Sequence, residues 1–430
     1  MDILIKIIQL LASLSLLVLI HELGHFFFAK LFKTRVERFY LFFHPWFSLF
    51  KYKKGDTVYG IGWLPLGGYV KIAGMIDESM DKDQLKKPAQ PWEFRSKPAY
   101  QRLLIMFGGV LFNFIFAMII YSMSLMHWGE EYLSMKDVKY GIYCDSLALD
   151  MGLRHGDIIE KVGNKPIDNF SEIMMHILLE NQNNITVNRH GEQVILQIPE
   201  KTKQQIIATN NQEFVLPFVP FYIDSVLPGS PAFKAQLQKG DHIVSLNGKQ
   251  TPAFFDFLKS IKTYKNKLVN IEIERAGQKK SVQLTVSKEG QIGVAIVSLD
   301  KLFKFRKTEY SFLQSIPAGI SKGVSTLGSY IKQMKLIFTP EGAKQVGGFA
   351  SIGSLFPTFW DWQIFWGMTA FLSVVLAFMN VLPIPALDGG HIMFVLYELI
   401  TGKKPSDTFL EKAQLIGMAI LLTLLIYANG

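Results

Sequence analysis

Four long apolar stretches divide the chain, and polar segments separate them. The apolar stretches cover residues 3–20, 103–127, 359–379 and 415–428. A transmembrane helix requires about 20 mainly apolar residues, so this pattern predicts about four membrane spans. The first stretch has Lys6 near its start, as a signal peptide would, but no small-residue cleavage site follows it. We therefore expect the first stretch to be a retained transmembrane helix.

Between the second and third spans the chain becomes polar and its sequence repeats. Residues 146–159 align without gaps with residues 230–243, and a Gly-Asp pair occupies the same place in both copies. Each copy predicts a short helix, a Gly-Asp turn and an apolar strand, followed by a second helix and two further strands. Only two copies occur, which excludes a solenoid. The repeat predicts two tandem α+β modules, residues 129–212 and 213–300.

Two other segments have patterns of their own. Residues 57–73 mix strand-forming residues with Gly and Pro, which predicts a β-hairpin with its turn near residues 65–68. Its aromatic and aliphatic content favours a place beside the membrane, and a plain soluble hairpin is the alternative. Residues 310–338 predict an amphipathic helix along the membrane surface that starts near Pro317. The remaining boundaries follow: a membrane part at 1–128, a surface segment at 301–357 and a membrane part at 358–430.

Composition and charge narrow the class of protein. A chain of 430 residues with 49% hydrophobic and 19% charged residues fits a membrane protein with a sizeable soluble insert. The net charge is +9, but Lys and Arg are scattered and no nucleic-acid motif occurs, so no nucleic acid is expected as a partner. Lys and Arg are frequent between residues 30 and 101, which predicts a cytoplasmic loop. The two modules would then lie outside the cytoplasm. The single cysteine, Cys144, excludes an internal disulfide and a cysteine-based metal site.

Candidate chemistry begins at the end of the first span, in the sequence His-Glu-Leu-Gly-His. His21 and His25 lie four residues apart, so on a helix they share one face and can bind one metal ion. Glu22 lies one step round the helix, where its carboxylate could reach a water activated by the metal without being a ligand. A histidine inside a membrane can also serve only as a hydrogen-bonding residue between helices. Ionisable residues in a span are costly, however, and favour a functional site.

A second informative stretch follows the third span and runs from Asn380 to His391. Its two prolines interrupt the helix, and Asp388 precedes a Gly-Gly pair. Asp388 is either a helix N-cap or the third metal ligand. Three protein ligands with one open position are typical of catalytic zinc, and mixed imidazole and carboxylate ligands favour Zn²⁺ over calcium or magnesium. Asn380 would support the site or hold substrate, and His391 would be structural. Within the second span, Gly108 and Gly109 predict close helix packing and Asn113 is expected to face the bundle interior.

Taken in order, these motifs resemble the site-2 protease family of intramembrane zinc proteases, in particular its RseP type with two PDZ domains. The resemblance rests on HELGH, LPLGGYVK, GGVLFNF, the two PDZ-like repeats and NVLPIPALDGGH. It implies metal ligands at His21, His25 and Asp388, a catalytic carboxylate at Glu22 and substrate contacts at Asn380. It also implies that the segment containing Gly67, Gly68 and Tyr69 pairs with an unwound substrate. The chain departs from the family pattern at residues 43–45, where a Gly-x-Gly turn is usual, and at Val375 and Phe349.

The resemblance further implies a place and a set of partners. The protein would lie in a bacterial inner membrane, with its active site near the cytoplasmic side and its PDZ domains in the periplasm. Its substrates would be single-span membrane proteins such as an anti-sigma factor, together with signal-peptide remnants. An upstream site-1 protease would cut first, and the PDZ pair would exclude untrimmed proteins.

Two other classes of function compete with a protease. A membrane adaptor would use the PDZ pair to bind peptide ends, but it would not need Glu22 beside an intact set of candidate ligands. A transporter or channel would use buried ionisable groups for ions, but the four predicted spans show no internal repeat.

Overall fold

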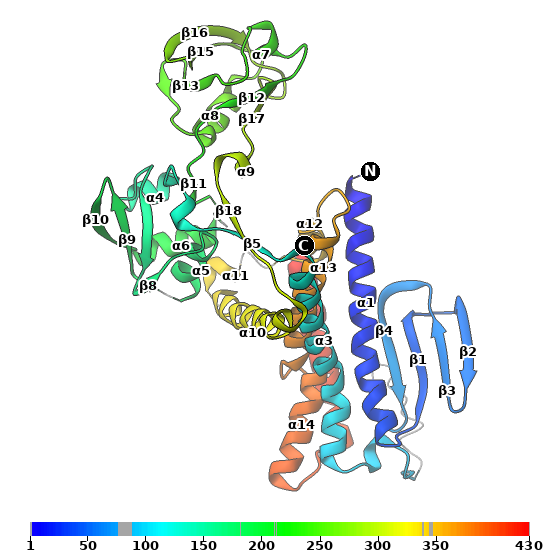
Figure 1. Ribbon diagram of the computed structural model, residues 1–430. Helices are drawn as coiled ribbons and strands as arrows, with labels where there is room; N and C mark the ends of the chain where they lie inside the picture. Colours follow the sequence, from blue (N-terminus) through cyan, green and yellow to red (C-terminus); the bar gives the residue numbers. More distant parts are fainter. Residues whose placement is uncertain are drawn as a thin grey trace. The chain divides into compact units, whose positions relative to one another are not determined.

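The computed structural model describes residues 2–75, 88–180, 182–209, 211, 213–337, 339–343 and 347–429. It forms two units (Figure 1). The membrane unit comprises Met1–Gly129, Glu309–Phe338 and Val346–Gly430, and the second unit comprises Glu130–Thr308 and Thr339–Gln345. The predicted lysine-rich loop between residues 30 and 101 is therefore described except for residues 76–87.

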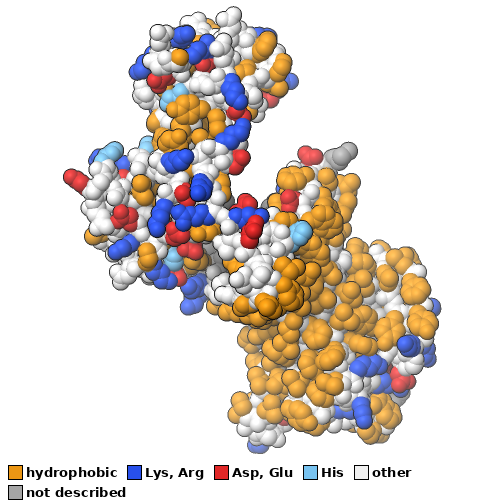
Figure 2. All heavy atoms as spheres, viewed as in Figure 1, with side chains coloured by type: hydrophobic (Ala, Val, Ile, Leu, Met, Phe, Trp, Pro, Cys, Tyr) orange, Lys and Arg blue, Asp and Glu red, His pale blue; other side chains and the backbone are white. Residues whose placement is uncertain are grey.

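All four predicted apolar stretches are helical over most of their length, and only residues 359–361 of the third lie before its helix. They lie in α1 (Asp2–Leu31), α3 (Ala99–Trp128), α13 (Trp362–Val381) and α15 (Asp407–Asn429). Each is long and apolar enough to cross a membrane, so the prediction of four candidate spans is confirmed. Figure 2 shows hydrophobic side chains covering the visible face of these helices. In water such a surface would be unfavourable, whereas in lipid it is the expected surface of a membrane-spanning bundle.

The predicted hairpin at residues 57–73 is wrong. The segment contains two strands that do not pair with each other, β3 (Thr57–Ile61) and β4 (Leu64–Ile72). Both pair with β1 (Val36–Phe43), β3 in parallel and β4 antiparallel, and β2 (Phe50–Lys54) pairs with β3. The resulting four-stranded sheet has the order β2-β3-β1-β4. A turn near residues 65–68 does not occur because Pro65 lies inside β4, an edge strand, where a missing N–H is tolerated.

The amphipathic helix at residues 310–338 is present as α10 (Phe312–Ile337), but it does not start at Pro317. The backbone N–H and hydroxyl of Ser311 both donate to the side-chain oxygen of Gln314, at 3.1 and 3.0 Å. A serine followed three residues later by glutamine is a helix-start signature, and it places the start before the proline. The small residues of α10, Ser315, Gly319 and Gly323, are buried. Gly319 lies against Ser122 of α3, so one face of α10 packs on the membrane bundle.

The second unit contains two hydrophobic cores. The chain passes from the first core to the second between Val219, which belongs to the first, and Phe221, which belongs to the second. Leu302 and Phe303 return to the first core. Each core lies under a four-stranded sheet, β10-β9-β7-β8 in the first and β14-β13-β15-β16 in the second.

The remaining elements of the second unit complete the two halves. The first half and its edge contain β5 (Glu130–Leu133), β6 (Ile142–Cys144), α4 (Ser146–Asp150), β7 (Ile158–Val162), β8 (Lys165–Pro166), α5 (Glu172–Leu179), β9 (Asn184–Arg189), β10 (Glu192–Gln197), α6 (Glu200–Ala208), β11 (Val215–Pro217) and β18 (Phe305–Thr308). The second half contains β12 (Ile223–Val226), α7 (Pro231–Lys234), β13 (His242–Leu246), β14 (Lys249–Gln250), α8 (Phe254–Ile261), β15 (Leu268–Arg275), β16 (Gln278–Thr285) and β17 (Val294–Ile296).

The two halves carry the same buried ion pair. Arg189 donates two hydrogen bonds to Asp157, both at 2.8 Å, and Arg275 donates two to Asp241, at 2.6 and 2.7 Å. Both carboxylates are almost completely buried, with 1% and 0% of their surface exposed. The Asp of the repeated Gly-Asp turn therefore fixes the turn to the sheet in each half. Removing one partner of such a pair leaves a buried charge without its counter-ion.

The single cysteine offers a test of this pair. Cys144 belongs to the first core, and burial raises the pKa of its thiol to about 12. A thiol reagent therefore reacts with it mainly when the first half opens. We expect Arg189→Ala to lower the free energy of unfolding of the first half by roughly 3 kcal/mol. Labelling of Cys144 should then accelerate on the order of 100-fold. Arg275→Ala is the matched control, because its pair lies in the other half and should leave the labelling rate nearly unchanged. Equal acceleration by both variants would contradict separate opening of the halves.

Candidate metal centre

Helix α1 carries His21 and His25 and approaches α3 very closely at their level. A Cβ atom on Gly24 would overlap the carbonyl oxygen of Gly108, and one on Gly108 would lie 2.5 Å from the carbonyl oxygen of Gly24. Only a pair of glycines allows this approach, so the predicted close packing at Gly108 and Gly109 is confirmed. The approach places Gly109 directly beside both imidazoles.

Asp388 enters the site from the other side. Helix α13 ends at Val381, and α14 (Asp388–Thr401) begins after a turn that contains Pro383 and Pro385. A Cβ on Gly390 would lie 2.6 Å from the Cα of Pro385, so glycine is needed where the new helix folds back on the proline turn. Leu387 occupies the N-cap position of α14, and no side-chain capping bond is made there. The Asp388 carboxylate is therefore free to point toward α1.

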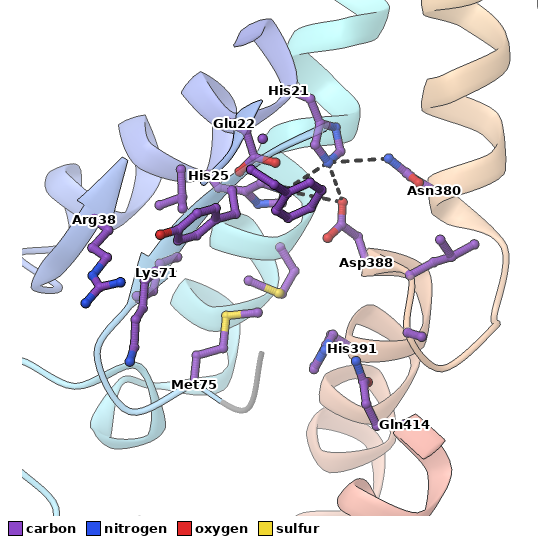
Figure 3. A pocket seen from close by; sticks show the side chains of 18 residues that line it. His21, Glu22, His25, Arg38, Lys71, Met75, Asn380, Asp388, His391 and Gln414 are labelled. Atoms are coloured by element: carbon purple, nitrogen blue, oxygen red, sulfur yellow. Dashed lines mark hydrogen bonds and ion pairs between the residues drawn. The ribbon is translucent and has the colours of Figure 1, made fainter. Parts of the chain in front are cut away.

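The two histidines and Asp388 meet at one point (Figure 3). The Oδ2 atom of Asp388 lies 3.1 Å from Nε2 of His21 and 3.3 Å from Nε2 of His25, and the two Nε2 atoms are 3.2 Å apart. This Oδ2 atom is buried and accepts no hydrogen bond from the residues that the structure describes. The Nδ1–H of His25 donates to the carbonyl oxygen of Ile105 at 2.8 Å, which leaves Nε2 with a lone pair. Two imidazole nitrogens and an orphaned carboxylate oxygen are a donor set that fits Zn²⁺.

Glu22 lies beside the cluster but is not part of it. Its side chain lies close to β4, because a Cβ on Gly68 would lie 3.6 Å from Cγ of Glu22. Glu22 and the three cluster residues line one cavity of about 500 Å³. Asn380 lines it too, with its Nδ2 atom 3.3 Å from Nε2 of His21. The cavity therefore brings together a candidate metal site, a free carboxylate and space for a substrate.

The predicted substrate-binding residues of β4 are placed differently from one another. Gly68 and Tyr69 line the cavity, whereas Gly67 is not among the lining residues and lies against the ring of Phe43. The ring of Tyr69 stacks on Tyr40, with centroids 5.6 Å apart, and on His44 at 5.7 Å. His44 thus stands in a ring stack where the family pattern has a Gly-x-Gly turn.

Several lining residues were not predicted as site residues from the sequence. They include Arg38, Lys71, Met75, Met106 and Gln414. Arg38 and Lys71 are register partners on β1 and β4. A correct pairing of β1 with β4 would have placed these two cations together, but nothing in the local sequence indicates that pairing.

Gly109 should be essential to the metal centre. A Cβ at this position would lie 2.5 Å from Nε2 of His25 and 2.6 Å from Cε1 of His21. Both rings would have to move, and metal sites tolerate displacements of only about 0.5 Å. We expect Gly109→Ala to weaken zinc binding at least tenfold, measured by competition with a chelator. Gly367→Ala in α13 is the control, because a Cβ there meets no atom within 4 Å. Equal zinc affinity in the two variants would contradict the tight contact.

Two imidazoles on a span-length apolar helix, joined by a carboxylate at the start of α14, define a membrane-embedded metalloprotein. Comparison with known proteins makes this more specific. The model of Peptidase family M50 matches residues 9–424, and the chain belongs to this family of site-2 proteases. The protein is therefore an integral membrane zinc metalloprotease.

Individual relatives agree over almost the whole chain. A protein of Borreliella burgdorferi named "Putative zinc metalloprotease" is 30% identical over 400 residues, which cover 91% of this chain and 90% of that protein. The "Regulator of sigma E protease" of Haemophilus influenzae is 27% identical over 445 residues, with 97% and 96% covered. Among solved structures, the PDZ domain of the SdrC-like protein of Listeria monocytogenes matches 20% of this chain and 95% of its own length, at 22% identity and a TM-score of 0.18.

Proposed function

We propose that this protease hydrolyses peptide bonds within or near the transmembrane segments of single-span membrane proteins. The observation that carries the proposal is one cavity, between apolar span-length helices and the sheet, that is lined by the histidine–aspartate cluster, by Glu22 and by the edge strand β4. A soluble substrate would not need its scissile bond delivered into such a bundle.

Each of the candidate site residues in the cavity has a different role in the proposed reaction. His21, His25 and Asp388 hold the zinc ion, which when bound supplies a Lewis acid that activates water and polarises a peptide carbonyl. Glu22 takes the proton from the attacking water and passes it to the leaving nitrogen as general base and then general acid. Asn380 points its amide nitrogen toward the cluster and can donate to the oxyanion that forms on the peptide carbonyl.

Strand β4 would hold the substrate in an extended form. It is an edge strand of its sheet, so one side of its backbone is unpaired by other strands. A transmembrane helix satisfies its own backbone groups and must unwind before its carbonyl can be attacked. Addition of the unwound segment to β4, beside Gly67, Gly68 and Tyr69, would replace the lost hydrogen bonds.

The second unit would select substrates. Its two halves share a strand order and a buried Asp–Arg pair, which supports reading them as two tandem PDZ-like domains. On this proposal they lie on the periplasmic side of a bacterial inner membrane, with the active site near the cytoplasmic side. They would exclude proteins with bulky outer domains until a site-1 protease trims them. Anti-sigma-factor-like proteins and signal-peptide remnants are the substrate class proposed, since one relative is named for sigma E regulation.

A model single-span substrate tests both parts of the proposal. Replacing two glycines near the cut by alanine stabilises its helix by about 1 kcal/mol each, so cleavage should slow by at least tenfold. A folded domain fused to its outer end should also reduce cleavage, and deletion of residues 141–286 should restore it. Cleavage that ignores helix stability would contradict the unwinding step. If the fused domain still prevents cleavage after residues 141–286 are deleted, the second unit does not select substrates.

A further inference from the structure

We propose that Asn113 is a positioning residue for the metal ligand His21, whose ring it holds in the tautomer that presents Nε2 to the zinc ion. This inference rests on the proposed zinc site. It concerns a residue of α3 that takes no part in the cluster itself.

Asn113 lies one helical turn after Gly109, on the face of α3 that meets α1. No part of its surface is exposed, and its amide Nδ2 atom is 3.3 Å from Nδ1 of His21. The other amide atom, Oδ1, is buried and has no hydrogen-bond partner within the described part of the chain. A buried amide that leaves one of its two polar atoms without a partner is costly, so the position favours a role for the other atom, which faces His21.

The two nitrogens of the His21 ring have different surroundings. Nε2 faces the Asp388 carboxylate and Nε2 of His25, as a metal ligand should. A neutral imidazole that binds metal through Nε2 carries its proton on Nδ1, and this N–H requires an acceptor. His25 already has such an acceptor, the carbonyl oxygen of Ile105. For His21, the amide of Asn113 lies within hydrogen-bond distance of Nδ1.

The Asn113 amide supplies the acceptor when it is rotated by 180°. The oxygen and nitrogen of an amide have nearly the same shape, so the rotation exchanges them without moving other atoms. It places Oδ1 where it accepts the Nδ1–H of His21, and it removes a conflict in which a proton on Nδ1 would face the amide N–H. Both imidazoles of the cluster then donate from Nδ1 to an oxygen, which fixes their orientation and raises their basicity.

The backbone of Asn113 is held at the required distance. Ser373 of α13 donates its hydroxyl to the carbonyl oxygen of Asn113 at 2.7 Å, and Ser373 is fully buried. This bond fixes α3 against α13 without reaching His21. It therefore offers a control that disturbs the packing of the same residue but leaves the amide in place.

The test compares zinc affinity among full-length variants purified in detergent. Asn113→Leu keeps the size of the side chain and removes the acceptor, and we expect it to weaken zinc binding by 10- to 100-fold. Asn113→Asp restores an acceptor and should bind zinc at least as tightly as wild type. Ser373→Ala should stay within a few-fold of wild type. Chelator competition gives the affinity, and the visible spectrum of the Co²⁺-substituted protein reports on ligand geometry without any activity measurement.

The outcomes separate this inference from the zinc site itself. If Asn113 served only packing, Asn113→Leu should bind zinc more tightly than Asn113→Asp, because leucine suits a buried position and a carboxylate does not. Wild-type affinity in Asn113→Leu, or an equal loss in Asn113→Asp, would overturn the inference. If Asn113→Leu fails to fold, the comparison is made between Asn113→Ala and Asn113→Asp. Tighter zinc binding by Asn113→Asp supports the inference, and equal binding overturns it. If Asp388→Ala binds zinc as wild type does, the proposed site fails and the role of Asn113 fails with it.

Discussion

Glu22→Gln should retain zinc and lose almost all proteolysis. Glutamine has nearly the same shape as glutamate, but its amide cannot take a proton from water. Glu22 is also outside the group of converging ligand atoms. General acid–base catalysis contributes about 10²- to 10⁴-fold, so cleavage should fall by at least two orders of magnitude. Cleavage of a model transmembrane substrate and zinc content should be measured on the same preparation.

Asp56→Asn is a suitable control, because Asp56 belongs to the same unit, has an exposed side chain that pairs with Arg35 at 3.7 Å, and is not among the residues that line the cavity. Its zinc content and cleavage should stay near those of wild type. If Glu22→Gln cleaves as well as wild type, Glu22 is not the base. If Glu22→Gln loses zinc instead, the residue is a ligand and the assignment of Asp388 must be reconsidered.

The candidate site was largely predictable because its chemistry is local in sequence. His21 and His25 occupy one helical face by spacing alone, and the structure places them 3.2 Å apart at Nε2. Asp388 could be paired with them from the sequence because it follows the end of the third apolar stretch and is therefore expected on the same side of the membrane as His21 and His25. What could not be predicted was the side of the site formed by β4, whose place depends on pairing with β1.

The sheet shows why strand pairing was the weak point. Residues 57–61 and 64–72 are consecutive strands separated by two residues, which locally favours a hairpin. The short link instead passes the end of β1, and the N–H of Gly62 donates to the carbonyl oxygen of Leu41 at 2.8 Å. Whether β3 and β4 pair with each other therefore depends on β1, a strand that precedes both of them in the sequence. The role of Asn113 was hidden for the same reason, since one amide in an apolar helix does not reveal which ring it will meet.

Asp388→Ala should release the metal. The substitution removes the carboxylate oxygen that lies 3.1 and 3.3 Å from the two imidazole nitrogens and leaves two protein ligands. Catalytic zinc normally requires three. We expect a loss of zinc affinity greater than the 10- to 100-fold that is typical of removing an outer hydrogen-bond partner. Equilibrium dialysis against zinc at fixed pH would measure it, and proteolysis should be lost in parallel.

Asp361→Ala is the control that distinguishes loss of a metal ligand from loss of a helix cap. Asp361 caps α13 by accepting a hydrogen bond from the N–H of Ile364 at 2.8 Å, so its removal costs about 1 kcal/mol of helix stability. It should leave zinc binding unchanged. Had Asp388 been only a helix-start residue, the two aspartate variants would behave alike, with slightly lower stability and full zinc content. A zinc loss confined to Asp388→Ala, together with zinc retention in Glu22→Gln, would assign one carboxylate to the metal and the other to the proton.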